Sequence, residues 1–153
     1  MFKLQNNLQI IPQMIRFLTY LIILLICQTT SFSNEKSKFF EIGQKKYAEK
    51  KFEEAKFNFQ KDIVRNPKNT KSYLYLAKIF KELKDENEFE KNLNNVLLLE
   101  PKNEEALYLI ILKKIDDADY EVANSKYELF KKECASLCSK KNELNQLLNK
   151  SKS

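Results

Sequence analysis

Two cysteines four positions apart, Cys134 and Cys138, are the residues of this sequence best suited to chemistry. A C-x3-C pair can form a disulfide, hold a soft metal ion or exchange disulfides with another protein. The 153-residue chain contains no histidine, however. It therefore lacks the commonest catalytic base and the imidazole ligand of many metal sites. Glu133 also opposes the nearby Lys140 and Lys141, which disfavours a reactive thiolate.

We favour a structural disulfide between the two cysteines. On an unbroken helix, Cβ atoms four residues apart lie about 5–6 Å from each other, whereas a disulfide needs roughly 3.8 Å. A Cys134–Cys138 bond therefore predicts that the preceding helix ends near Cys134 and that a turn follows. Closing so short a loop contributes only about 2 kcal/mol, so the bond would mainly fix the angle of a following helix. Redox-active, metal-binding and buried reduced thiols are the alternatives.

The composition indicates helices and argues against a nucleic-acid surface. One glycine and three prolines are too few for a turn-rich β protein, and abundant Lys, Glu, Leu, Asn and Ala favour helices. The net charge of +6 comes almost entirely from lysines, and these alternate with glutamates along the chain. Surfaces that bind nucleic acid are usually richer in arginine and more one-sided.

A 34-residue repeat organises most of the chain. The stretch NPKN at 66–69 returns as EPKN at 100–103, which places Pro67 and Pro101 34 residues apart. Alignment on this period gives unit one (36–69), unit two (70–103) and unit three (104–137), with Ala135 where unit three lacks its proline. Each unit has two apolar stripes at helical spacing separated by a polar break, which predicts a pair of amphipathic helices. We expect helices near 37–49, 53–65, 70–83, 86–99, 104–116 and 120–133.

Polar residues at the breaks are suitable helix caps. Asp85 and Asp119 precede the second helices of units two and three, and Asn103 precedes the first helix of unit three. Asn69 or Thr70 has the same place in unit two. Short polar side chains at such positions accept hydrogen bonds from free N–H groups at a helix start.

Residues 138–153 follow the last unit and predict an end cap with a disordered tail. A stack of helix pairs leaves an apolar face at its end that needs cover. Leu144, Leu147 and Leu148 have the spacing to cover the last pair, while the intervening Lys and Asn residues face water.

The order of large and small residues in each unit resembles the tetratricopeptide repeat (TPR). The landmarks are Phe39-x2-Ile42-Gly43, Ala55-x3-Phe59 and Pro67 in unit one; Tyr73-x2-Leu76-Ala77-x2-Phe80, Phe89-x3-Leu93 and Pro101 in unit two; and Leu107-x2-Ile110 and Ala123-x3-Tyr127 in unit three. The resemblance implies an all-α protein, a right-handed α-solenoid of three helix-turn-helix repeats plus a C-terminal capping helix.

The resemblance also implies a concave groove lined by the first helix of each unit, where a peptide or helix of a partner protein lies. The lining positions are Phe40, Gln44, Tyr47, Lys71, Leu74, Lys78, Lys81, Tyr108, Leu112 and Ile115. Apolar residues beside lysines favour a partner with apolar anchors and acidic residues. The alternative is that the apolar residues pack against each other or under the end helix, and that the lysines form a solvated face.

The carboxylate clamp of some TPR domains is not expected here. That clamp needs Lys and Asn in unit one and Lys and Arg in unit three. The corresponding positions of this chain hold Phe40, Gln44, Glu105 and Leu109.

Residues 1–33 have a different composition and are typical of a secretory signal. The uncharged apolar run from Phe17 to Cys27 has 11 residues, whereas a transmembrane helix needs about 20. Small residues at Ser31 and Ser33 predict cleavage after Ser33, and Met14 is an alternative start. An uncleaved membrane anchor is the other interpretation.

Together these patterns predict an exported, non-enzymatic protein-binding module of the bacterial periplasm or cell envelope. No cofactor, metal or nucleic-acid partner is expected. Two alternatives stay open: a thiol-redox or metal-handling envelope protein that uses Cys134 and Cys138, and an assembly scaffold anchored in the inner membrane by its N-terminal segment.

Overall fold

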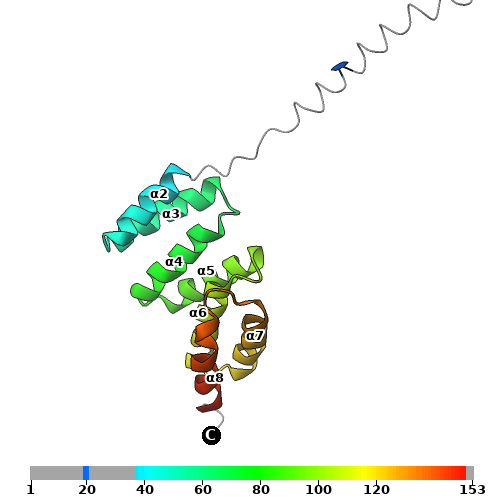
Figure 1. Ribbon diagram of the computed structural model, residues 1–153. Coiled ribbons are helices and arrows are strands. Elements are labelled where there is room, and N and C mark those ends of the chain that lie inside the picture. Colours follow the sequence, from blue (N-terminus) through cyan, green and yellow to red (C-terminus); the bar gives the residue numbers. More distant parts are fainter. Residues whose placement is uncertain (1–18, 21–36, 151–153) are drawn as a thin grey trace, which may run out of the picture. The chain divides into compact units, whose positions relative to one another are not determined.

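The computed structural model describes residues 19–20 and 37–150, and residues 37–150 form three helix pairs and an end helix (Figure 1). The pairs are α2 (Lys38–Ala48) with α3 (Phe52–Arg65), α4 (Thr70–Glu82) with α5 (Glu86–Leu99), and α6 (Glu104–Asp116) with α7 (Tyr120–Glu133). A short 3-10 turn, η1 (Cys138–Lys140), leads into α8 (Lys141–Lys150). All six helices expected in the repeat units are present, with bounds within one residue of the prediction. The proposed signal segment lies almost wholly outside the described residues, as does the end of the tail.

Small residues let the two helices of a pair approach each other closely. Ala55 in unit one and Ala123 in unit three are fully buried, as expected for positions where helices cross. Gly43 shows the tightest approach, because a Cβ atom there would lie 2.8 Å from Cε1 of the Phe59 ring. The aromatic core of unit one therefore depends on the single glycine of the chain.

The first helix of every unit ends in the same turn. Lys50, Lys84 and Ala118 each have φ 58°, the left-handed conformation. In unit one, the Lys51 N–H then donates to the Lys46 carbonyl at 2.9 Å, a bond that closes a helix end of the Schellman type. Glycine usually holds the left-handed position because other residues are strained there. The chain forms this turn three times without a glycine at the left-handed position.

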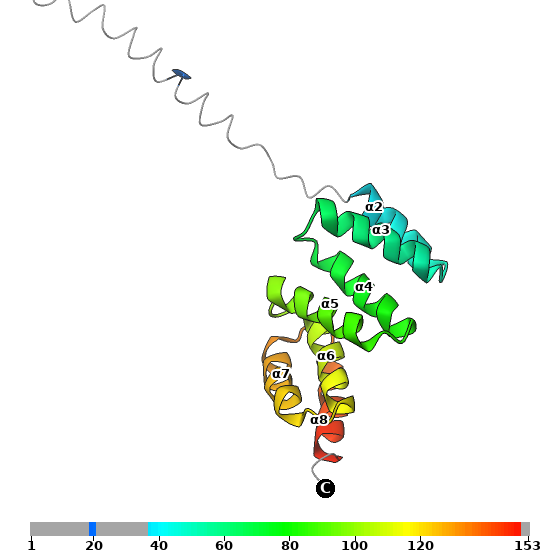
Figure 2. The same ribbon diagram turned by 180° about the vertical axis from the view of Figure 1, so that it is seen from behind.

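The pairs stack through the second helix of one unit and the first helix of the next. α3 packs against α4, and α5 packs against α6 (Figure 2). Asp85, Asp119 and Asn103 cap their helices through side-chain oxygens, as predicted.

Asn69 precedes α4, but its side chain does not accept the expected cap hydrogen bond. The amide donates to Oδ2 of the buried Asp62 at 2.6 Å, and the Ser72 hydroxyl donates to the same oxygen. The other carboxylate oxygen, Oδ1, is buried without a hydrogen-bond partner in the described part of the chain. The first junction is thus held by a polar contact between α3 and α4.

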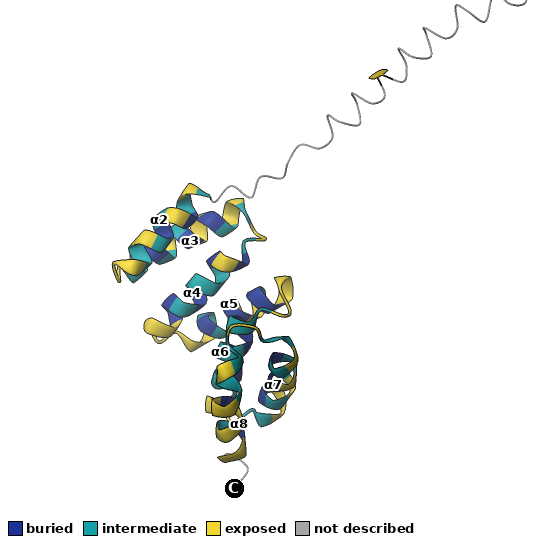
Figure 3. Cartoon of the chain, in the orientation of Figure 1, coloured by how far each residue is buried: buried dark blue, intermediate teal, exposed yellow. Residues whose placement is uncertain are grey.

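α8 covers the C-terminal end of the stack, as the leucine spacing predicted. It packs against both α6 and α7. Leu144 and Leu148 are buried and Leu147 is half-buried, while the polar residues between them are exposed. The side of α8 seen in Figure 3 is mostly exposed. Among the helices of residues 19–20 and 37–150, none is long and apolar enough to cross a membrane.

Candidate protein-binding site

Side chains of α2 and α4 meet on the face formed by the first helices of the three units. The Gln44 amide donates to the Tyr75 hydroxyl at 3.1 Å. The Tyr47 and Tyr75 rings meet edge to face, with centroids 5.2 Å apart. Tyr75 in turn stacks on the buried Phe59 ring at 4.8 Å. Tyr75 therefore fixes the positions of both α2 side chains against the core.

An ion pair links the same face from α4 to α6. Lys78 Nζ lies 2.6 Å from Glu105 Oε1, and it also lies 5.3 Å from the centroid of the Tyr75 ring. A chain of contacts thus runs from Gln44 of α2 through Tyr75 and Lys78 of α4 to Glu105 of α6. We call this surface the first-helix face; its members are Gln44, Tyr47, Lys71, Leu74, Tyr75, Lys78, Lys81, Glu105, Tyr108 and Leu112.

Phe40 is not part of this face. Its side chain is 2% exposed and packs edge to face against the Phe59 and Tyr75 rings, at 5.7 and 5.9 Å. The prediction that Phe40 lines a groove is therefore wrong. The sequence places an aromatic residue at a lining position, but the ring turns into the gap between α2, α3 and α4.

The lysines of α4 have different surroundings. Lys71 and Lys81 are exposed, and neither forms an ion pair within residues 37–150. Lys81 lies over the Phe89 ring at 5.8 Å, whereas Lys78 is half-buried and held by Glu105. Two of the three predicted cations are therefore available to a partner.

The apolar residues of the face are partly covered. Leu74, Leu112 and Ile115 are half-buried and pack against the core. Burial raises the pKa of the Tyr47 hydroxyl above its usual value. Each of these side chains thus presents an edge rather than its whole surface.

Tyr108 is half-buried and contacts the end helix. Its hydroxyl donates to Glu143 Oε1 at 2.9 Å, and Lys140 Nζ lies 5.6 Å from its ring centroid. Burial, followed by the Glu143 carboxylate, raises the pKa of the Tyr108 hydroxyl. The C-terminal end of the first-helix face is therefore joined to α8.

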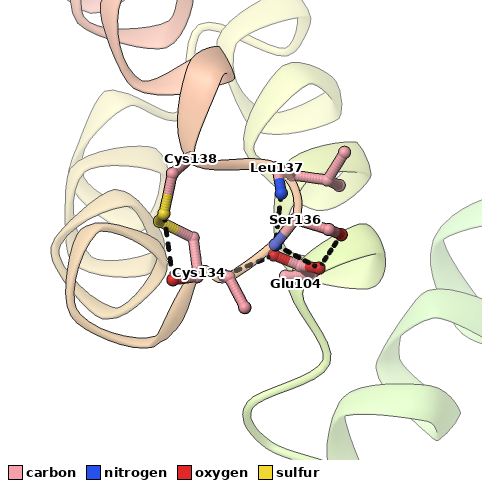
Figure 4. Close-up of a disulfide and its surroundings, with 6 residues drawn as sticks. Glu104, Cys134, Ser136, Leu137 and Cys138 are labelled. Atoms are coloured by element: carbon pink, nitrogen blue, oxygen red, sulfur yellow. Dashed lines mark hydrogen bonds between the residues drawn. A yellow bond between two sulfur atoms is a disulfide. The ribbon is translucent and has the colours of Figure 1, made fainter.

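The cysteine pair lies in the turn that ends unit three. α7 ends at Glu133, and Cys134 has an extended backbone with φ −62° and ψ 142°. The prediction that the helix stops near Cys134 is thus confirmed. The two sulfur atoms lie 2.13 Å apart and the Cα atoms 5.3 Å apart (Figure 4). The turn therefore brings Cys134 and Cys138 into the arrangement in which a disulfide forms.

A carboxylate that sequence reasoning missed holds the same turn. Glu104, the first residue of α6, accepts the Ala135 and Leu137 N–H groups on Oε2 at 2.8 and 3.0 Å. Its Oε1 accepts the Ser136 N–H at 3.2 Å and also the Ser136 hydroxyl (Figure 4). The Ser136 hydroxyl, followed by the Leu137 and Ala135 N–H groups, lowers the pKa of the Glu104 carboxyl from 4.5 to about 2.

No group of three or more Cys, Asp or Glu side chains in residues 19–20 and 37–150 is placed to hold a metal ion. The first-helix face combines amines, one carboxylate and phenol hydroxyls, which bind by charge and hydrogen bonds. The arrangement is suited to recognition.

Three of the solved structures that are similar to this chain illustrate its fold. The first TPR of Spaghetti (RPAP3), bound to an HSP90 peptide, shares 21% identity over 75% of this chain and 94% of that one, with a TM-score of 0.66. The Yersinia enterocolitica type III secretion chaperone SycD, in complex with a peptide of the translocator YopD, shares 15% over 78% and 97%, also at 0.66. The TPR2B domain of yeast Sti1, in a complex with pHsp70, shares 18% over 75% and 94%, at 0.64. No family model and no curated protein sequence matches the chain.

These similarities define the fold. The chain is an all-α, TPR-type right-handed solenoid of three helix-turn-helix repeats with a C-terminal capping helix, as the repeat pattern predicted. The low identities show the fold alone.

Proposed function

We propose that this protein is a non-enzymatic interaction module that binds a peptide or helix of another protein along the first-helix face. The observation that carries the proposal is the continuous chain of contacts from Gln44 of α2 through Tyr75 and Lys78 of α4 to Glu105 of α6. Three proteins of the same fold form complexes of this type, with an HSP90 peptide, a YopD peptide and pHsp70. A shared fold and a suitable surface support peptide binding here.

The partner segment would carry acidic residues beside apolar ones. Lys71 and Lys81 are exposed without a carboxylate partner in the described part of the chain, so an incoming acidic group meets no competitor. The exposed edges of Tyr47 and Leu74 offer apolar contact nearby. Such a combination of apolar anchors and flanking charge is common in peptide recognition.

Export to the bacterial periplasm or cell envelope is the setting that we propose. The signal-like composition of residues 1–33 supports it, and so does the cysteine pair, since disulfides persist in oxidising compartments. We further propose that Cys134 and Cys138 are disulfide-bonded in the exported protein. A retained N-terminal anchor is the second candidate for this segment.

Site-specific photo-crosslinking in the producing cells tests the binding face. A photoreactive residue at Tyr47 or Lys71 is expected to capture a partner protein. The matched controls are Leu98 and Val122, exposed side chains of second helices, which should not capture it. Capture of the same partner from the control positions alone would contradict the proposal.

Charge reversal then tests the chemistry of recognition. A synthetic copy of the captured peptide should bind the Lys71→Glu/Lys81→Glu variant at least tenfold more weakly than the unaltered protein. An exposed pair elsewhere, Lys68→Glu/Lys102→Glu, provides a control of equal charge change. Equal loss in both variants would show a general charge effect instead of recognition by the face.

The intact mass of the isolated protein, with thiol alkylation before and after reduction, tests the setting. We expect a chain that begins at Asn34 and two thiols that react only after reduction. A retained N-terminus would support the anchored scaffold, and two free thiols would remove the proposed disulfide.

A further inference from the structure

Within residues 37–150, the outer side of α2 lacks the helix that packs against the first helices of units two and three. Phe39 occupies in unit one the position of Tyr73 in unit two and Leu107 in unit three, one and two periods of 34 residues later. In those units the second helix of the preceding unit packs against the first helix. Leu107 is fully buried as a result. Within residues 37–150, no helix precedes α2 to cover Phe39 in this way.

A hollow marks the uncovered surface. It has a volume of about 320 Å³ and is lined by Phe39, Phe57, Gln60, Lys61, Val64 and Arg65. Phe57 is 57% exposed and Val64 is 83% exposed, among the largest values for apolar side chains of the described residues. Apolar side chains that surround a hollow favour an inserted apolar group.

Two cationic side chains line the same hollow. Lys61 Nζ lies 4.2 Å from the Phe57 ring centroid and 5.4 Å from that of Phe39, and the Arg65 guanidinium lies 4.6 Å from the Phe39 centroid. Within residues 37–150, neither cation forms an ion pair with a carboxylate. Both charges therefore remain free to pair with an acidic group that arrives with the apolar one.

The charges also argue against a second copy of this chain as the occupant. A symmetric end-to-end dimer would bring Lys61 and Arg65 against the same two cations of the other copy, and like charges disfavour such contacts. The opposite end is covered by α8, whose outer side is exposed (Figure 3) and carries polar residues. A head-to-tail contact would therefore oppose an apolar hollow with Asn, Gln and Lys side chains.

The chain's own N-terminal segment fits the charges poorly as well. Residues 1–36 contain a single carboxylate, Glu35, beside three basic residues. At the position of Phe39, the stacking inside the molecule shows what fits, since a helix packs against the first helix of both other units. A helix with carboxylates beside its apolar stripe satisfies both the shape and the charge.

We propose that the hollow over Phe39, Phe57 and Val64 is a docking site for an amphipathic helix of another protein that carries acidic residues beside its apolar stripe. The site is separate from the first-helix face. Lys61 and Arg65 select the partner by pairing with its carboxylates, and the hollow takes one of its apolar side chains.

Photo-crosslinking from the hollow tests the proposal. Photoreactive residues are placed at Phe57 and Val64 of the full chain in the producing cells, with Leu98 as the control because its side chain is 79% exposed on another helix. We expect both hollow positions, and not Leu98, to link to one peptide of another protein. Mass spectrometry of the crosslinked peptide identifies its sequence.

A synthetic copy of that peptide then serves as the probe. It should become helical on binding and should bind the Lys61→Glu/Arg65→Glu variant at least tenfold more weakly, while a peptide with its acids changed to lysine regains affinity for that variant. The Lys71→Glu/Lys81→Glu variant should bind the probe normally, which separates this site from the first-helix face. Thermal unfolding of each variant checks that the fold is retained.

Several outcomes would overturn the proposal. In the crosslinking experiment, these are crosslinks to residues 1–36 of the same chain, to a second copy or to lipid, or no crosslink at all. In the binding experiment, it is an affinity that does not change when the charges of Lys61 and Arg65 are reversed. Crosslinks to residues 1–36 would identify the hollow as a binding site for the chain's own N-terminal segment.

Discussion

The second and third junctions of the stack turn the chain at the same place in the repeat by different means. At the second junction, Glu100 precedes Pro101 with φ −132° and ψ 82°, and the Asn103 N–H closes the turn on the Glu100 carbonyl at 3.0 Å. At the third, Cys134 is extended, and the equivalent Leu137 N–H donates to the Glu104 carboxylate. At the third junction, hydrogen bonds to the Glu104 side chain of α6 thus replace the proline and the local backbone hydrogen bond.

The comparison shows that the side chain of the first residue in a unit forms hydrogen bonds with the last residues of the same unit. The Thr70 hydroxyl, at the first position of unit two, donates to the Glu100 side chain at the end of unit two. Glu104, at the first position of unit three, accepts hydrogen bonds from the end of unit three. Both units have such a contact, and the third unit, which lacks the proline, makes it through four hydrogen bonds in place of one.

The largest effect at the third junction is expected from Glu104→Ala. The change removes the acceptor of three backbone N–H groups, and hydrogen bonds to a charged group contribute about 1.5–3 kcal/mol each when buried. Because this site is partly open to water, we expect a total loss of about 2–3 kcal/mol in the free energy of unfolding. Urea titration measures it. Glu105→Ala, which removes one exposed ion pair, should cost no more than about 1 kcal/mol.

The same carboxylate predicts a pH dependence that belongs to the third junction. The pKa of Glu104 falls from 4.5 to about 2 in the folded protein, so its stabilisation is complete above pH 4.5 and is lost as the pH falls towards 2. The stability difference between the unaltered protein and Glu104→Gln should therefore be constant near neutral pH and shrink below pH 4.5. A difference that stays constant down to pH 2 would show that ionisation of Glu104 does not stabilise the turn.

Removal of the proposed disulfide should have the next largest effect. For so short a loop, the chain-entropy argument gives about 2 kcal/mol, so Cys134→Ser/Cys138→Ser should lower the free energy of unfolding by that amount. Reductant should lower the stability of the unaltered protein equally and leave the double variant unchanged. If reductant has no effect on the unaltered protein, the two thiols are free.

A proline transplanted to the third junction should destabilise it. Repeat alignment alone suggests that Ala135→Pro restores the pattern of Pro67 and Pro101. The Ala135 N–H, however, donates to Glu104 at 2.8 Å, and proline has no N–H to donate. We expect a loss of about 1–2 kcal/mol by chemical denaturation, and a gain would contradict the role of this bond.

The smallest effect is expected from Pro101→Ala at the second junction. Its main consequence is a more flexible unfolded chain, which costs about 0.4–1 kcal/mol. The same denaturation measurement on Pro101→Ala and Ala135→Pro tests the comparison directly. Both changes should destabilise, although they are opposite substitutions at equivalent positions.

Short-range patterns made much of the fold predictable. The helix bounds, the cap residues Asp85, Asp119 and Asn103, and the buried leucines of α8 follow from apolar spacing and local hydrogen bonding. The left-handed turns at Lys50, Lys84 and Ala118 were not predicted, because their residue types do not signal positive φ. Only their common place in the 34-residue period could have indicated them.

The candidate site was predicted less completely. Its helices were identified, yet Phe40 proved to be a core residue, and Tyr75 and Glu104 were missed. Tyr75 lies between two apolar residues of an amphipathic helix, and the sequence does not say which way its ring turns. Comparison of the first positions of units two and three, Thr70 and Glu104, is the one signal that could have pointed to Glu104.

The sequence by itself determined that this chain forms helix pairs with a 34-residue period, because helix formation and capping depend on neighbours within a few positions. The tertiary structure decided which side chains remain on the surface and which polar groups meet. Glu104 lies 31 to 33 residues from the N–H groups that it binds, and Gln44 lies 31 residues from Tyr75. Such contacts exist only after the helices have packed and stacked, since packing brings separated positions within hydrogen-bond distance.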